Sequence, residues 1–131
     1  MNAYNDDRYV STAAEVFALL ADGTRIRIIR ALRDGELSVG QLTERVGRPQ
    51  AAVSQHLTKL YAGGMVLRRQ EGVRVFYRLA DEHALALADQ AMLQAEHLLD
   101  DTPRHHREHA DTMGSDKAGI VAADKQGGWN G

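Results

Sequence analysis

The 131-residue sequence predicts a mainly α-helical domain with one small β-hairpin, arranged as a winged helix-turn-helix. Apolar residues recur at helical spacing in four segments before residue 63, the last two joined by a tight turn that contains glycine. Over residues 75–79, after a turn at Gly72, apolar residues alternate with polar or exposed positions. This pattern predicts a β-hairpin that would form the wing. A longer helical segment at about residues 82–99 completes the domain.

Two amphipathic helices are expected to come first. The first covers residues 12–21, where the apolar residues lie on one side of a helix. Asp22 and Gly23 interrupt it, and Thr24 is the expected N-cap of the second helix. The second helix buries its isoleucines and ends at Asp34-Gly35.

The helix-turn-helix follows. Ser38 and Gln41 form a capping-box pattern that begins the third helix, and Gly47 ends it. Pro49 suits the first turn of the fourth helix, which ends at Gly63-Gly64. Residues 12–100 are therefore expected to form the winged helix-turn-helix domain. We expect residues 1–11 to be a flexible N-terminus and residues 110–131 a disordered tail.

The near-neutral total charge of −2 conceals a basic middle segment. Residues 1–22 carry a net charge of −3, residues 23–80 carry +7 and residues 81–131 carry −6. A basic segment of this kind favours a polyanionic partner, because Lys and Arg contacts to phosphate release counterions.

The fourth helix has an outward face that suits double-stranded DNA. At 100° per residue, Val53, Leu57 and Leu60 share the inward side. The opposite arc is small and polar with one cation, as a major-groove reader requires, and comprises Ala51, Ser54, Gln55, Thr58 and Lys59. Ser54 and Gln55 are expected at base edges and Lys59 at phosphate, with Arg68, Arg69 and Arg74 of the wing on the DNA backbone or minor groove. The alternative is an ordinary solvated helix, and His56 is expected to be a half-buried packing residue.

Several classes of protein are excluded by composition. The chain has no cysteine, which rules out a disulfide scaffold, a thiolate metal site and a cysteine nucleophile. The longest apolar run, residues 16–21, is far too short to span a membrane, so a cytoplasmic protein is expected. No His-Glu-x-x-His motif, glycine-rich phosphate loop or catalytic triad pattern is present, so we expect no enzyme.

The order and spacing of these motifs resemble the ArsR/SmtB family of metal-sensing transcriptional repressors. The segments that carry the resemblance are residues 20–32 (LADGTRIRIIRAL), 36–42 (ELSVGQL), 54–60 (SQHLTKL) and 69–79 (RQEGVRVFYRL). The resemblance implies that residues 12–100 are a DNA-binding and dimerisation domain. It implies a homodimer through the first and last helices that represses its operator and releases it when an inducer metal binds. Thiophilic members carry Cys-x-Cys where this chain has Ser38-Val39-Gly40, so sensing through that site is excluded.

His83 and His97 lie on one face of the last helix, because 14 residues turn almost a whole number of times. Along the axis they are about 21 Å apart, too far for both to bind one ion at bonds of about 2 Å. An antiparallel second copy would place His83 of one subunit beside His97 of the other, twice by symmetry. A dimer is thus the condition for this metal site.

Residues 95–106 also resemble the nickel- and cobalt-responsive actinobacterial branch of the family (NmtR/KmtR type, most like KmtR). That resemblance nominates His83, Glu96, His97, His105 and His106 as ligands, with Asp81 as an alternate carboxylate, and residues 101–109 as a segment that completes the site. Gln94 replaces a histidine usual in the family, and Glu96 lies 100° from His97 on an ideal helix. Nitrogen and oxygen ligands without sulfur suit octahedral Ni(II) or Co(II), and Zn(II) is the alternative inducer.

Two other functions stay open at this point. One is a repressor of the same family without metal sensing. The other, more remote, is a metal buffer based on the histidine-rich C-terminal segment.

Overall fold

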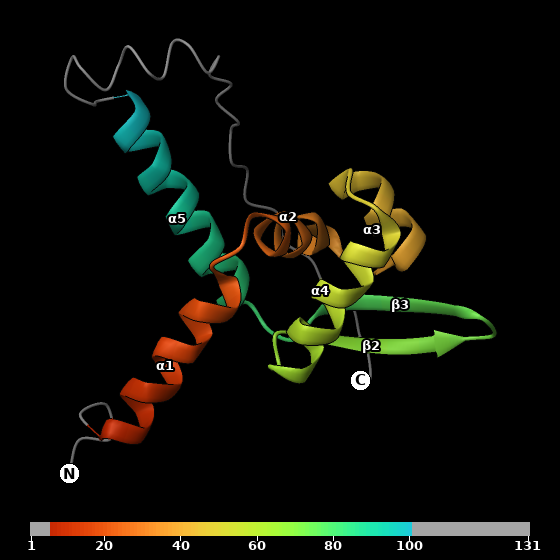
Figure 1. Ribbon diagram of the computed structural model, residues 1–131, viewed down its shortest axis with the longest axis horizontal. Helices are drawn as coiled ribbons and strands as arrows, with labels where there is room; N and C mark the ends of the chain where they lie inside the picture. The colour runs from red at the N-terminus through yellow and green to blue at the C-terminus, as the bar shows by residue number, and fades with distance from the viewer. Residues whose placement is uncertain (1–5, 101–131) are drawn as a thin grey trace.

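The computed structural model describes residues 6–100. The elements in chain order are α1 (Asp7–Leu20), α2 (Gly23–Ala31), the 3₁₀ turn η2 (Leu32–Asp34), β1 (Leu37–Ser38), α3 (Val39–Val46), α4 (Gln50–Ala62), β2 (Val66–Glu71), β3 (Arg74–Leu79) and α5 (His83–Asp100). This is the predicted winged helix-turn-helix, with α3 and α4 as the helix-turn-helix and β2–β3 as the wing (Figure 1). None of the helices in this range is long and apolar enough to cross a membrane.

The starts of the first two helices differ from the prediction. α1 begins at Asp7, inside the segment expected to be flexible, because the Asp6 carboxylate accepts a hydrogen bond from the backbone N–H of Arg8 at 2.8 Å. The expectation of a flexible segment up to residue 11 is therefore wrong for residues 7–11. Asp22, not Thr24, is the N-cap of α2, since its side chain accepts from the backbone N–H of Arg25 at 3.1 Å.

The helix-turn-helix has the predicted local signals. Ser38 Oγ accepts from the Gln41 backbone N–H at 3.1 Å, and Gln41 Oε1 accepts from the Ser38 N–H at 2.8 Å, which completes the capping box of α3. Gly47 ends α3 with a left-handed φ of 72°, a conformation that favours glycine. Pro49 stands at the N-cap of α4 rather than inside its first turn.

The wing belongs to a three-stranded antiparallel sheet of order β1-β3-β2. Glu71 pairs with Arg74 across a two-residue turn in which Gly72 has a φ of +63°. Leu37 pairs with Tyr77, and Ser38 pairs with Phe76. The strand β1 adds an element to the predicted hairpin, and it connects the wing to the start of α3.

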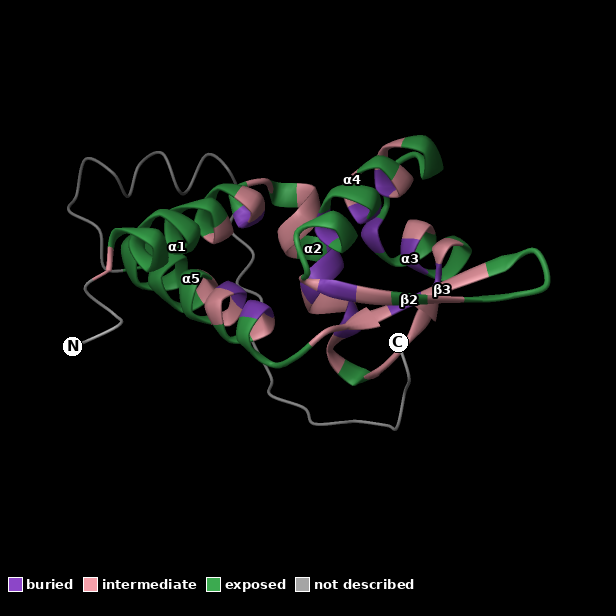
Figure 2. Cartoon of the chain, turned by 90° about the horizontal axis from the view of Figure 1, so that it is seen from below, coloured by how far each residue is buried: buried purple, intermediate pink, exposed green. Residues whose placement is uncertain are grey.

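The core lies between α2, α3, α4 and the root of the wing. Ile28, Ile29, Leu42, Leu57 and Leu60 are wholly buried there. Outside it, α1 and the outer part of α5 leave this body on the side opposite the hairpin tip and are largely exposed (Figures 1 and 2). Their exposed large apolar side chains are Tyr9, Val10, Phe17, Leu93, Leu98 and Leu99. Both helices therefore present apolar surface that the isolated protomer leaves uncovered.

Candidate functional site

The helix α4 presents the face that the sequence predicts. Val53, Leu57 and Leu60 are buried, which fixes the rotation of the helix. On the other side Ala51, Gln55, Thr58 and Lys59 are exposed, and Ser54 is half-buried. The Thr58 hydroxyl donates to the Ser54 carbonyl oxygen at 3.0 Å, so it is held against its own helix. Gln55 and Lys59 are thus the longest side chains on the outward face.

A polar contact on the inner side of α4 ties this helix to α1 and α2. His56 is half-buried, as its position on the helix predicts. Its Nδ1 accepts from Arg25 Nε at 3.1 Å, and Arg25 Nη1 donates to the Leu19 carbonyl oxygen at 2.8 Å. His56 Nε2 lies 3.8 Å from Asp22 Oδ1, and the backbone N–H of Arg25 lowers the pKa of the Asp22 carboxyl. His56 is therefore held by Arg25 as part of the scaffold behind the outward face.

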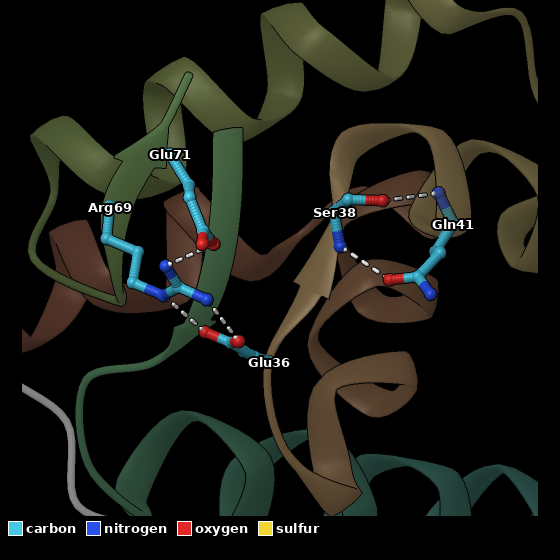
Figure 3. Close-up of polar contacts among 5 residues, drawn as sticks. All are labelled: Glu36, Ser38, Gln41, Arg69 and Glu71. Carbon is cyan, nitrogen blue, oxygen red and sulfur yellow. Dashed lines mark hydrogen bonds and ion pairs between the residues drawn. The ribbon is translucent and has the colours of Figure 1, made fainter. Parts of the chain in front are cut away.

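The three arginines predicted on the wing differ in their surroundings. Arg68 stacks over the Tyr61 ring at 4.3 Å, and Arg74 lies 5.0 Å from the Phe76 ring centroid. Arg69 instead donates to the Glu36 and Glu71 carboxylates (Figure 3). Among residues 6–100, neither Arg68 nor Arg74 forms an ion pair. Of these three arginines, one is thus bound by carboxylates and two are not.

The helix α5 is attached to the body through α2. Asp89 accepts from Arg33 at 2.8 and 3.0 Å, and Arg30 Nε lies 3.5 Å from the same carboxylate. The hydrogen bonds with Asp89 raise the pKa of Arg33. This cluster lies between His83 and His97 in the sequence of α5, so it connects the candidate metal helix to the DNA-binding body.

The candidate metal ligands lie at the two ends of α5. Asp81 Oδ1 accepts from the His83 backbone N–H at 2.9 Å, which caps the start of the helix. His83, Glu96 and His97 are all exposed. Within residues 6–100, no group of three or more His, Cys, Asp or Glu side chains is placed to hold a metal ion. His105 and His106 lie outside the described residues.

His83 and His97 can share one metal ion only if two chains meet. Imidazole and carboxylate donors without sulfur suit Ni(II), Co(II) and Zn(II). The rise of α5 puts His83 and His97 about 21 Å apart, so one protomer brings only one of the two imidazoles to any ion. An intersubunit site is the arrangement that uses both.

Comparison with known proteins decides the family. The model of the bacterial regulatory proteins of the arsR family matches residues 22–67. The HTH-type transcriptional regulator KmtR of Mycobacterium tuberculosis is 46% identical over 101 residues, which are 77% of this chain and 78% of KmtR. The chain belongs to the ArsR family.

Other ArsR-family relatives agree. The regulator NmtR of the same bacterium is 36% identical over 71% of this chain and 78% of its own length. The homodimeric winged helix-turn-helix DNA-binding domain Mb0332 from Mycobacterium bovis, solved by NMR, has a TM-score of 0.63 and 31% identity over 76% of this chain and 93% of that domain. These relatives are named as regulators or DNA-binding domains, so the chain is a DNA-binding transcriptional regulator and not an enzyme, as predicted.

Two further basic residues lie just before α4 in the chain, and they were not singled out from the sequence. Arg45 is in the last turn of α3, and Arg48 is in the turn that leads to α4, where its Nη1 donates to the Gly47 carbonyl oxygen at 3.2 Å. Both are exposed. In helix-turn-helix proteins the first helix crosses the DNA backbone, which makes such positions candidates for phosphate contacts. Both residues belong to the basic segment 23–80 and flank the Gly47 turn, and this position in the sequence could have identified them.

Proposed function

We propose that this regulator is a homodimeric repressor of a metal efflux or homeostasis operon, and that it releases its operator when Ni(II) or Co(II), or alternatively Zn(II), binds between the α5 helices of its two subunits. The observation that carries the proposal is the placement of His83 and His97 on opposite ends of one exposed helix face. The names of KmtR and NmtR describe regulators, and the likeness to them supports the regulatory part. Operator binding requires the compartment that holds the chromosome, the cytoplasm.

The dimer is supported by uncovered apolar surface. Phe17 of α1 is 61% exposed, and Leu98 and Leu99 of α5 are 54% and 53% exposed. Exposed large apolar side chains on these two helices indicate an interaction surface. A second copy of the same chain covers them in a twofold arrangement, and the similar Mb0332 domain is homodimeric.

The DNA contacts are assigned to the outward face of α4 and to the wing. In this proposal α4 enters the major groove, where Ser54 and Gln55 meet base edges and Ala51 and Thr58 pack beside them. Lys59, Arg68 and Arg74 meet phosphate. Twofold symmetry then places the two α4 helices in successive major-groove half-sites about one helical turn apart.

The metal ligands are assigned across the dimer. His83 of one subunit and His97 of the other form the centre of the site, and Asp81, Glu96, His105 and His106 are the further candidates. Metal binding there supplies a coupling free energy between the α5 pair and the DNA face, typically ~1–3 kcal/mol or about 5- to 150-fold in operator affinity. Within the chain, Asp89 attaches α5 to Arg33 of η2, directly after α2, so a shift of α5 is transmitted to the helix-turn-helix.

A titration tests this function. Fluorescence anisotropy with a duplex selected from a random library by the wild-type protein measures the affinity at fixed salt, with Ni(II), Co(II) or Zn(II) added. We expect at least one metal to weaken binding. His97→Ala is expected to keep the metal-free affinity and to lose the response.

Two results separate the alternatives. If none of the three metals changes the operator affinity, the protein is a regulator of this family that does not sense metal. Removal of residues 101–131 tests the metal-buffer alternative. A metal buffer would lose its capacity to bind metal, whereas a repressor keeps its DNA binding.

A further inference from the structure

The three nitrogens of the Arg69 guanidinium all donate to carboxylates of the protein. Its Nε and Nη2 donate to the two oxygens of Glu36 at 2.8 and 2.7 Å, and its Nη1 donates to Glu71 Oε1 at 3.0 Å (Figure 3). Its flat face lies 4.5 Å from the centroid of the Phe76 ring. Each of the three nitrogens thus donates to a carboxylate. A phosphate that took the paired Nε and Nη2 donors would have to displace the Glu36 carboxylate, whose two oxygens already match that edge of the guanidinium.

The ion pair of Glu36 and Arg69 spans the sheet. Arg69 pairs with Phe76 on one side of β3, and Ser38 pairs with Phe76 on the other. Glu36 directly precedes β1, so the side chain of Arg69 reaches across the central strand from one outer strand toward the other. This contact joins the wing to the segment that leads into the capped start of α3.

The local charge also separates Arg69 from its neighbours. Glu36 and Glu71 together balance the positive charges of Arg69 and of Arg78, which also interacts with Glu36, and the hydrogen bonds from Arg69 hold the pKa of Glu36 below its usual value. Arg68 has tyrosine partners, and Arg74 lies over Phe76 without a carboxylate partner in residues 6–100. The region of Arg69 therefore attracts a phosphate less than the regions of the other two arginines do.

We propose that Arg69 is a positioning residue: its bridge to Glu36 fixes the angle of the wing relative to the helix-turn-helix, and the phosphate contacts of the wing are left to Arg68 and Arg74. This proposal rests on the proposed DNA binding and changes the expectation from sequence, which placed all three arginines on DNA. In this proposal Glu36 increases operator affinity, although it is an acidic residue of a DNA-binding domain.

The salt dependence of DNA binding tests the proposal. Each phosphate contact contributes about 0.9 to the slope of log affinity against log salt concentration, so one arginine in each subunit contributes about 1.8 for the dimer. Arg69→Ala in the full chain is expected to lower operator affinity with an unchanged slope. The matched variant Arg74→Ala is expected to make the slope less steep, by about 1.8. A loss of slope in Arg69→Ala equal to that of Arg74→Ala would overturn the proposal.

A charge exchange provides the second test. Arg69→Glu gathers three carboxylates and is expected to weaken operator binding, whereas the double variant Glu36→Arg with Arg69→Glu rebuilds the bridge and is expected to recover at least about threefold. If Arg69 contacts phosphate, the exchange leaves a glutamate facing DNA and recovers nothing. Glu36→Gln is expected to lower operator affinity, and an increase would contradict the proposal.

The failure of this inference is distinguishable from failure of the proposed function. A wild-type protein that binds no duplex in a salt-dependent way contradicts the function itself. A wild-type protein that binds normally, with Arg69→Ala losing slope, contradicts only the positioning role. Thermal unfolding of each variant at the assay salt checks that the compared proteins are folded.

Discussion

At the residue scale, the carboxylate neighbours of each cation decide which basic groups are available to DNA. The segment 23–80 has a net charge of +7, but Arg33 and Arg69 are held by Asp89 and Glu36. Lys59 is exposed on the outward face of α4. Net charge thus identifies the partner class, while the ion pairs identify which side chains meet it.

The first prediction concerns the acid stability that Glu36 supplies. Its pKa is lowered in the folded state, so its contribution is fully present above about pH 4.3, the ordinary value. The contribution is lost as the pH falls through the lowered pKa. Because the pair is partly exposed, Glu36→Gln is expected to cost only about 1 kcal/mol at pH 7.

Urea unfolding at pH 7, 5 and 3 measures this effect. The difference between wild type and Glu36→Gln is expected to be equal at pH 7 and 5 and to shrink toward pH 3. Glu44→Gln, an exposed position of α3, controls for the loss of one acidic charge. If the difference in unfolding free energy between wild type and Glu36→Gln stays constant down to pH 3, the stabilising role of ionised Glu36 is contradicted.

The second prediction concerns base recognition by Gln55. A side chain that forms hydrogen bonds to a base edge is worth about 1–3 kcal/mol of discrimination. Gln55→Ala is therefore expected to weaken binding to the selected operator by roughly 5- to 150-fold for each of the two half-sites and to leave binding to a random duplex nearly unchanged. The same ratio must hold with and without metal. Equal weakening on both duplexes would show that Gln55 does not read sequence.

At the scale of elements, the contact between α2 and α5 connects the DNA-binding body to the helix that carries the candidate metal ligands. Asp89 and Arg33 are both largely buried, with side-chain exposures of 19% and 12%. A buried guanidinium that loses its carboxylate keeps the cost of its desolvation. The pair is thus a strong attachment of α5 within the protomer.

The third prediction is the cost of breaking this attachment. Asp89→Asn is expected to lower the free energy of unfolding by about 1.5–3 kcal/mol, the usual worth of hydrogen bonds to a charged group. Urea unfolding at pH 7 measures the loss, and Glu82→Gln, an exposed position just before α5, is the control. A loss below about 0.5 kcal/mol, typical of a surface substitution, would show that the pair does not hold α5.

The elements that sequence predicts well are those with local signals. The capping box of α3 needs only Ser38 and Gln41, three residues apart, and the end of α3 needs only Gly47. The strand β1 has two residues and no measurable period, and its partners on β3 are remote in sequence, so it was not predicted. The early start of α1 depends on Asp6, a cap that precedes any clear apolar pattern.

At the scale of the whole molecule, the large apolar side chains of α1 and outer α5 require a partner. The fourth prediction is that Phe17→Glu lowers dimer stability, because it places a charge in the proposed interface. Sedimentation velocity is expected to show a shift toward monomer at micromolar concentration. Val73→Glu is a matched control, since Val73 is 94% exposed at the wing tip. An unchanged dimer in Phe17→Glu would place the interface elsewhere.

The site could be predicted from sequence wherever one helix carries it. A helical wheel is enough to separate the outward face of α4 from its buried side and to place His83 and His97 on one face of α5. The role of Arg69 could not be predicted, because its partner Glu36 is 33 residues away and meets it only through the sheet. Tertiary contacts thus decide which of several similar arginines are bound by carboxylates.

The most direct measurement of the central claim is the nickel stoichiometry of a mixed dimer, one subunit carrying His83→Ala and the other His97→Ala, purified through two different tags. If each metal lies between His83 of one subunit and His97 of the other, the mixed dimer keeps one intact site. Its tight nickel binding is then expected to exceed that of both parent homodimers by one ion per dimer. A mixed dimer that binds no more nickel than its parents would contradict the intersubunit site.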